Sequence, residues 1–138
     1  MSLKEEDRRV MVTLELEKAS KTLGQMRYNL QGCEWEMVAN RLYYALFHAV
    51  SALLISDKHE VGTHRGAVNK FRLFYVMEGI FSAEEGRLYS QLQSLRESGD
   101  YNCAIDVTED DIKGKVDPTI RLIEKIKKYI AIRNEQNT

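Results

Sequence analysis

Apolar residues recur along most of this chain at the three- and four-residue spacing of an α-helix. In the first segment, spacings of 4, 3, 4, 3 and 4 place apolar side chains on one stripe and most charged side chains elsewhere. That stripe consists of Val12, Leu16, Ala19, Leu23, Met26 and Leu30. Gly32 follows as a helix stop, so a first helix is expected to end there.

A second helix is expected from about residue 34 to residue 55, and it is apolar over most of its circumference. A helix with this pattern lies at the centre of a fold, with neighbours on several sides. One of its stripes carries the short side chains Ala45, Ala49 and Ala52, which would let a neighbouring helix approach closely.

Capping residues mark the beginnings of the later helices. Thr63 is a candidate N-cap for a helix over about 64–78, and Ser82 with Glu85 forms a capping box for a helix ending near Gly99. Thr108, followed by three acidic residues, opens a fifth helix that suits the helix dipole. At Pro118 we expect either a kink or a second short helix capped by Asp117.

No alternating run bounded by turn residues appears, so the expected fold class is all-α. The length of 138 residues suits a single domain, 1–138, with its core over about 8–132 and a polar, frayed tail over 133–138.

The formal net charge of −1 argues against strong non-specific attraction to nucleic acid or to acidic membranes. Two distant cysteines and no charged-then-apolar leader favour a cytoplasmic protein with free thiols. The longest apolar run is broken by His48 and Ser51, short of the roughly 20 residues that cross a bilayer, so no membrane span is expected.

The polar residues of the second helix form a line. Arg41, Tyr44, His48 and Ser51 are spaced 3, 4 and 3, which places them on one helical face. One interpretation is a solvent border, where tyrosine and arginine cover apolar surface with their stems. The other interpretation is that these side chains line a site.

Two further clusters allow the same pair of interpretations. Arg96, Asp100 and Tyr101 lie where the fourth helix ends, either as a surface ion pair worth at most about 1 kcal/mol or as part of a site. His64 and Arg65 lie at a helix N-terminus, as a solvated basic turn or as a phosphate site. The histidines have no metal-ligand spacing and no cofactor motif is present, so neither metal nor cofactor is expected.

Three segments, "NRLYYALFHAVSALL", "THRGAVNKF" and "SLRESGDY", resemble a HEPN domain of the small prokaryotic subgroup with the patterns Y-Y-A-x-F-H-A, T-H-x-G and L-R-x-x-x-D-Y. The resemblance implies an up-and-down bundle of about five helices that forms a homodimer. It also implies a toxin whose antitoxin is a minimal nucleotidyltransferase. Many HEPN toxins are metal-independent ribonucleases with an Arg, four to six residues, and then a His.

The chain departs from that last motif, because Tyr101 stands where a histidine is expected after Arg96. The resemblance carries Arg96 over as the phosphate-contacting residue and Tyr101 only as the occupant of the histidine position. Attack by a 2′-hydroxyl needs a group that accepts a proton near neutral pH. At pH 7 only about 0.1% of an unperturbed tyrosine is phenolate. His48 is therefore the candidate base, on the hypothesis that Arg96 and His48 meet in one site.

Two functions from different classes remain open. The protein is either a ribonuclease toxin that uses Arg96, Tyr101 and His48, or an inactive HEPN module that binds a nucleotide or a nucleotidyltransferase. In the second case Tyr44 and Tyr101 would stack on a base while Arg65 or Arg96 would contact its phosphates, and Arg41 of the polar stripe would belong to the same binding site. A third, structural alternative is that the polar stripe is only an interface.

Overall fold

The computed structural model describes residues 4–101 and 107–136, with the backbone alone over 98–101. None of these described residues lies in a strand, and the all-α prediction is confirmed. The elements are α1 (Glu5–Gln31), α2 (Trp35–Ser56), α3 (His64–Phe71), the π-helical turn η1 (Arg72–Val76), α4 (Ala83–Tyr101), α5 (Glu109–Ile112), the 3-10 turn η2 (Lys113–Lys115) and α6 (Val116–Gln136). Since η1 continues α3, and α5, η2 and α6 are contiguous, the described chain forms five helical segments, as expected.

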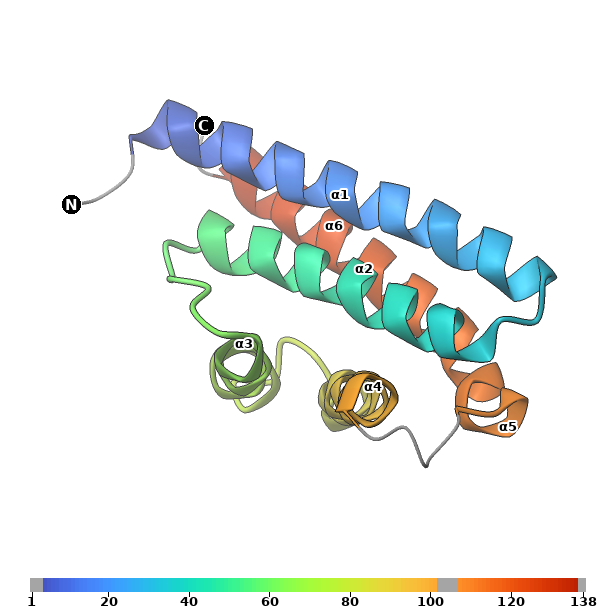
Figure 1. The fold of residues 1–138 in the computed structure, drawn as a ribbon. Coiled ribbons are helices and arrows are strands. Elements are labelled where there is room, and N and C mark those ends of the chain that lie inside the picture. Colours follow the sequence, from blue (N-terminus) through green and yellow to red (C-terminus); the bar gives the residue numbers. More distant parts are fainter. Residues whose placement is uncertain (1–3, 102–106, 137–138) are drawn as a thin grey trace.

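Helices α1 and α2 form an antiparallel hairpin, and α6 runs alongside them (Figure 1). Gly32 is the C-cap of α1, where the sequence places the stop. The three short residues Ala45, Ala49 and Ala52 are fully buried in α2. Because their side chains end at Cβ, neighbouring backbones can approach α2 closely, and α1 is its most extensive partner.

Helices α3 and α4 cross the hairpin at a steep angle and are seen almost end-on in Figure 1. The Thr63 side chain accepts the backbone N–H of Gly66 at 2.9 Å, which confirms it as the N-cap of α3. The predicted capping box of α4 is also present, because Ser82 and Glu85 exchange side-chain-to-backbone hydrogen bonds of 2.7 and 3.1 Å. Helix α4 continues past Gly99 to Tyr101.

In the last helical segment the irregular turn comes earlier in the sequence than expected. Thr108 caps α5 through a capping box with Asp111, as its acidic first turn suggests. The irregular part is η2, which contains Gly114, whereas Pro118 and Asp117 both lie inside the first turn of α6. Proline is tolerated there because a first-turn N–H has no helical partner. Of the two expected alternatives, the division into two helices is confirmed, whereas the kink at Pro118 and the cap at Asp117 were wrong. Helix α6 extends to Gln136.

Helix α2 is the centre of the fold, as its apolar pattern predicts. Ten of its apolar side chains pack with no exposed surface: Val38, Leu42, Tyr43, Ala45, Leu46, Ala49, Val50, Ala52, Leu53 and Leu54. By length and composition alone α2 is able to cross a membrane, but most of it is buried among the other helices. Burial over most of its circumference is what a central bundle helix requires, so the composition of α2 is explained by the fold itself.

Candidate functional site

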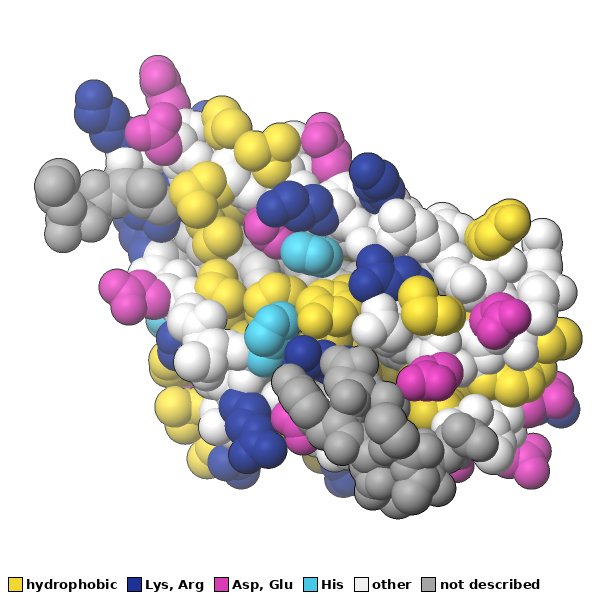
Figure 2. Space-filling model, viewed as in Figure 1, with side chains coloured by type: hydrophobic (Ala, Val, Ile, Leu, Met, Phe, Trp, Pro, Cys, Tyr) yellow, Lys and Arg dark blue, Asp and Glu magenta, His cyan; other side chains and the backbone are white. Residues whose placement is uncertain are grey.

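The polar stripe of α2 divides into an exposed part and a buried part. Arg41, Tyr44 and His48 are partly exposed, whereas Ser51 is 3% exposed and belongs to the core. Figure 2 shows histidine and hydrophobic side chains gathered on one face of the molecule, with Lys and Arg side chains around them. The exposed part of the stripe is thus the part available for chemistry.

His48 is held by a carboxylate from another helix. Its Nδ1 lies 2.7 Å from Oε2 of Glu15 in α1, and the two side chains are only 21% and 19% exposed. A carboxylate can only accept here, so Nδ1 carries the proton and Nε2 of a neutral His48 keeps a lone pair. This pairing is the one that leaves an imidazole able to accept a proton from a substrate.

Arg96 reaches the same region from α4. Its guanidinium carbon lies 5.3 Å from the ring centroid of Tyr43 and 5.4 Å from that of Tyr44, both in α2. The guanidinium of Arg41 also lies over the Tyr44 ring, at 5.2 Å. The neighbouring tyrosines of α2 therefore bring together cations from two helices.

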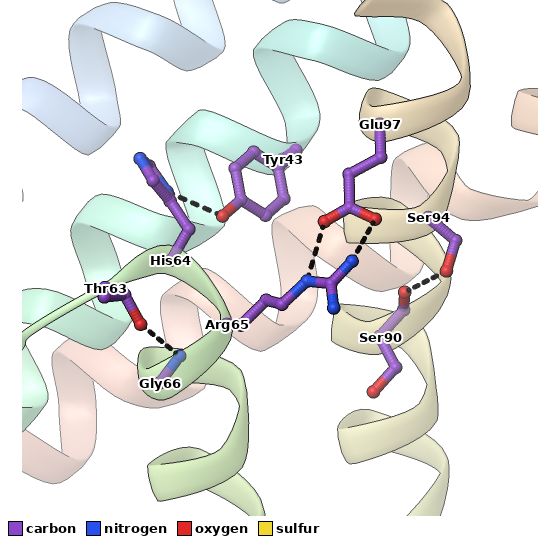
Figure 3. A network of polar contacts seen from close by, with 8 residues as sticks. All are labelled: Tyr43, Thr63, His64, Arg65, Gly66, Ser90, Ser94 and Glu97. Atoms are coloured by element: carbon purple, nitrogen blue, oxygen red, sulfur yellow. Dashed lines mark hydrogen bonds and ion pairs between the residues drawn. The ribbon is translucent and has the colours of Figure 1, made fainter. Parts of the chain in front are cut away.

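His64, the first residue of α3, also contacts these side chains. Its Nδ1 lies 2.8 Å from the hydroxyl of Tyr43 (Figure 3). The centroid of its ring lies 4.3 Å from that of Phe47. The Phe47 ring also neighbours His48, at 5.5 Å between ring centroids. The aromatic cluster of Tyr43, Tyr44 and Phe47 thus connects both histidines with Arg96.

Burial fixes the protonation of the Tyr43–His64 pair. Burial raises the pKa of Tyr43 to about 12, although the positive charge of Arg96 opposes that rise. Tyr43 is therefore a neutral hydroxyl, which can donate to Nδ1 of His64 or accept from it, depending on the tautomer of the imidazole. The pKa of His64 is lowered, first by burial and then by the positive charge of Arg96 and the nearby imidazole of His48. A neutral His64 that accepts at Nδ1 carries its proton on Nε2, which points away from Tyr43 in Figure 3.

Arg65 points instead toward α4. Its guanidinium lies 3.3 and 3.4 Å from the two carboxylate oxygens of Glu97 (Figure 3). The Arg65 side chain is 78% exposed, so the pair contributes at most about 1 kcal/mol to stability. Its charge is already opposed by Glu97, which weakens the expectation of a phosphate site built on this residue.

The structure brings together His48, His64, Arg96, Tyr44 and Arg41, which the sequence places in three separate segments. The side chains of Asp100 and Tyr101 lie outside the described residues. Among the described residues no group of three acidic, histidine or cysteine side chains is placed to hold a metal ion.

Two partners were missed from the sequence. Glu15 lies on the charged side of the first helix, where a solvent-facing role is the ordinary expectation. Tyr43 is out of phase with the polar stripe and fully buried, so its pattern indicates core packing alone. The adjacent tyrosines Tyr43 and Tyr44 were the indication in the sequence, because the hydroxyl of a buried tyrosine usually has a hydrogen-bond partner.

Comparison with known proteins agrees with this architecture, because the sequence profile of the HEPN domain matches residues 12–129. The chain belongs to the HEPN domain family. A "UPF0332 protein" of Thermotoga maritima is 30% identical to this HEPN chain over 80% of it and 89% of the relative. Two proteins of Methanocaldococcus jannaschii, named "Putative toxin MJ0142" and "Putative toxin MJ0605", are each 26% identical to it. These matches cover 86% and 94% of this chain, and 81% and 96% of the relatives.

Proposed function

We propose that this HEPN protein is the toxin of a nucleotidyltransferase-linked toxin–antitoxin module and acts in the cytoplasm as a metal-independent endoribonuclease. The family match and the names of two relatives support the toxin assignment. The observation that carries the ribonuclease assignment is the arrangement of His48, paired with Glu15, and Arg96 around one aromatic cluster.

In the proposed reaction the 2′-hydroxyl of a ribonucleotide attacks the adjacent phosphorus. Nε2 of His48 takes the hydroxyl proton, while Glu15 accepts the hydrogen bond from Nδ1 and stabilises the imidazolium that forms. The guanidinium of Arg96 supports the negative charge that develops on the phosphoryl oxygens. The P–O5′ bond breaks and the leaving 5′ oxygen takes a proton from water, which gives a 2′,3′-cyclic phosphate and a 5′-hydroxyl end. The imidazolium of His48 then returns its proton to solvent.

In the proposed site His64 has a different task from His48 and the opposite tautomer. Tyr43 donates to Nδ1 there, so the Nε2–H of His64 is a hydrogen-bond donor. This N–H binds a phosphoryl oxygen beside Arg96. One histidine thus removes a proton, and the other donates a hydrogen bond to the developing negative charge.

The test is metal-free cleavage of single-stranded RNA in the presence of a chelator. His48→Ala and Arg96→Ala are expected to lower the cleavage rate by at least about 100-fold, as loss of a general base or of charge stabilisation does. Both variants are also expected to abolish growth inhibition in cells that lack the neighbouring nucleotidyltransferase gene.

His59→Ala is the matched control, because His59 stacks on Phe74 at 4.1 Å, apart from the aromatic cluster. It should cleave RNA at the wild-type rate. Circular dichroism and thermal unfolding check that every variant is folded. Full activity of both His48→Ala and Arg96→Ala would rule out this site.

The second candidate is a catalytically inactive HEPN module that binds a nucleotide or a nucleotidyltransferase partner. The observation that favours it is Tyr101 at the position of the motif histidine. Retained partner or nucleotide binding, with no RNA cleavage by the wild-type protein, would select this function. In either case we expect a homodimer, which sedimentation measurements check.

A further inference from the structure

A surface hollow of about 560 Å³ lies beside the candidate site, between the C-terminal half of α1 and the beginning of α2. Its lining consists of Lys21, Gly24, Gln25, Tyr28, Asn29, Met37 and Arg41. The size falls within the range of small-molecule sites. Two cations and no carboxylate line it, although the whole chain has a net charge of −1.

The fold gives no structural reason for a glycine at position 24, in the wall of this hollow. Glycine in a helix interior costs about 1 kcal/mol relative to alanine. Gly24 has no positive φ, and a Cβ placed on it would meet nothing within 4 Å. Neither backbone conformation nor helix packing therefore requires glycine here. The absence of a side chain does keep the hollow open.

The hollow continues into the candidate site along one face of the hairpin. On α2, Met37, Arg41, Tyr44 and His48 follow one another at spacings of 4, 3 and 4, which is a single helical stripe. On α1, Gln25 contacts Arg41 at 2.9 Å and Glu15 contacts His48 at 2.7 Å. Seven residues separate Arg41 from His48, a rise of about 10 Å along the helix.

The lining chemistry suits a flat ring that carries negative charge. Tyr28 is 79% exposed and Met37 is 45% exposed, so both offer apolar surface to a ring. The guanidinium of Arg41 donates to the neutral amide oxygens of Asn40 and Gln25, so its charge is not cancelled. Aromatic side chains beside cations are what single-stranded nucleic acids bind.

We propose that this hollow binds a nucleotide of a single-stranded RNA that flanks the scissile phosphodiester, with its base on Tyr28 and its phosphate at Lys21 and Arg41. The inference rests on the proposed ribonuclease function and adds to it a defined second subsite. This second subsite makes the enzyme selective for RNA strands longer than a dinucleotide.

The experiment compares two RNAs. A fluorescein-labelled single strand of about 12 nucleotides reaches the hollow, and its dissociation constant is measured by anisotropy. A dinucleotide has a single phosphodiester, so its cleavage reports the candidate site alone. The variants are Tyr28→Ala, which removes the stacking surface, and Gly24→Leu, which fills the hollow and removes no contact.

Both variants should weaken binding of the longer RNA at least about fivefold, the effect of losing one stacked base. Lys21→Gln should lower the slope of log affinity against log salt by about 0.7, the value for one phosphate contact on a single strand. Dinucleotide cleavage should stay within twofold of wild type in all three. Met77→Ala, which alters an exposed residue outside this hollow, should bind like wild type.

Gly24→Leu separates ligand binding from stability, because leucine in a helix should raise the melting temperature while it lowers RNA affinity. Wild-type affinity in Tyr28→Ala and Gly24→Leu, with RNA cleavage otherwise present, would overturn the subsite alone. Changed oligomeric state or lost partner binding, with RNA affinity intact, would also overturn it. A wild-type protein that neither binds nor cleaves either RNA would instead contradict the ribonuclease function.

Discussion

The two histidines of the site show how a single partner atom decides what a residue can do. His48 meets a carboxylate and His64 meets a tyrosine hydroxyl, at 2.7 and 2.8 Å. The carboxylate must accept, which places the proton of His48 on Nδ1, whereas the hydroxyl can donate or accept. In the proposed reaction the hydroxyl donates, so Nε2 is a base in His48 and a donor in His64. The same residue type thus fills two complementary positions.

The partly buried position of His64 beside Arg96 predicts a pH dependence of stability. Its folded-state pKa is lowered from the usual 6.5, while Arg96, His48, Tyr43 and Tyr44 surround it. Below about pH 6.5 the unfolded chain takes up a proton that the folded chain does not, so the free energy of unfolding falls as the pH drops.

Urea unfolding of wild type and His64→Gln at about pH 7.5 and about pH 5 measures this contribution. The variant should lose less stability than wild type on acidification. His59→Gln controls for a histidine outside the cluster and should follow the wild type. An equal loss in His64→Gln and wild type would contradict the lowered pKa.

At the scale of elements, the α1–α2 hairpin depends on small side chains. Ala45, Ala49 and Ala52 are fully buried where neighbouring helices pack on α2. The same close approach places Glu15 of α1 within hydrogen-bond reach of His48. Helix spacing and the geometry of the site are therefore linked.

Ala45→Leu should destabilise the protein by about 1–3 kcal/mol, because a fully packed core has no room for three more carbons. Denaturant unfolding gives this value. Ala83→Leu, at an exposed position that begins α4, should change stability by no more than about 0.5 kcal/mol. A neutral Ala45→Leu would show that α2 does not pack tightly at this point.

At the scale of the whole molecule, one carboxylate joins three elements at the end of the bundle. Asp57, the C-cap of α2, accepts the hydroxyl of Tyr75 in η1 at 2.7 Å and pairs with Arg133 of α6 at 2.9 Å. Tyr75 is 2% exposed, whereas the side chain of Arg133 is 44% exposed. The hydrogen bond to the buried tyrosine therefore dominates, since exposed ion pairs contribute little.

Asp57→Ala should lower the free energy of unfolding by about 1–3 kcal/mol, because the buried Tyr75 hydroxyl then keeps only a long contact of 3.4 Å to the carbonyl of Leu53. Tyr75→Phe in the same background should recover much of the loss, because it removes that hydroxyl. Glu17→Ala, at an exposed position of α1, serves as the neutral control in thermal and denaturant unfolding. No recovery in the double variant would show that the ion pair matters more.

The amino-acid sequence by itself determined the helices and most of their ends. Apolar periodicity and the caps at Gly32, Thr63, Ser82 and Thr108 act within one or two turns, so local sequence is sufficient to specify them. Local sequence was insufficient for the segment from α5 to α6. A proline in the first turn of a helix has the same sequence context as a proline that breaks a helix.

Only the tertiary structure decided which side chains form the site. Glu15 and His48 are 33 residues apart, and Tyr43 and His64 are 21 residues apart. Periodicity tells which face of a helix carries a residue, but not which helix packs against that face. The roles of the two histidines depend on those packing partners, and packing is a property of the whole folded chain.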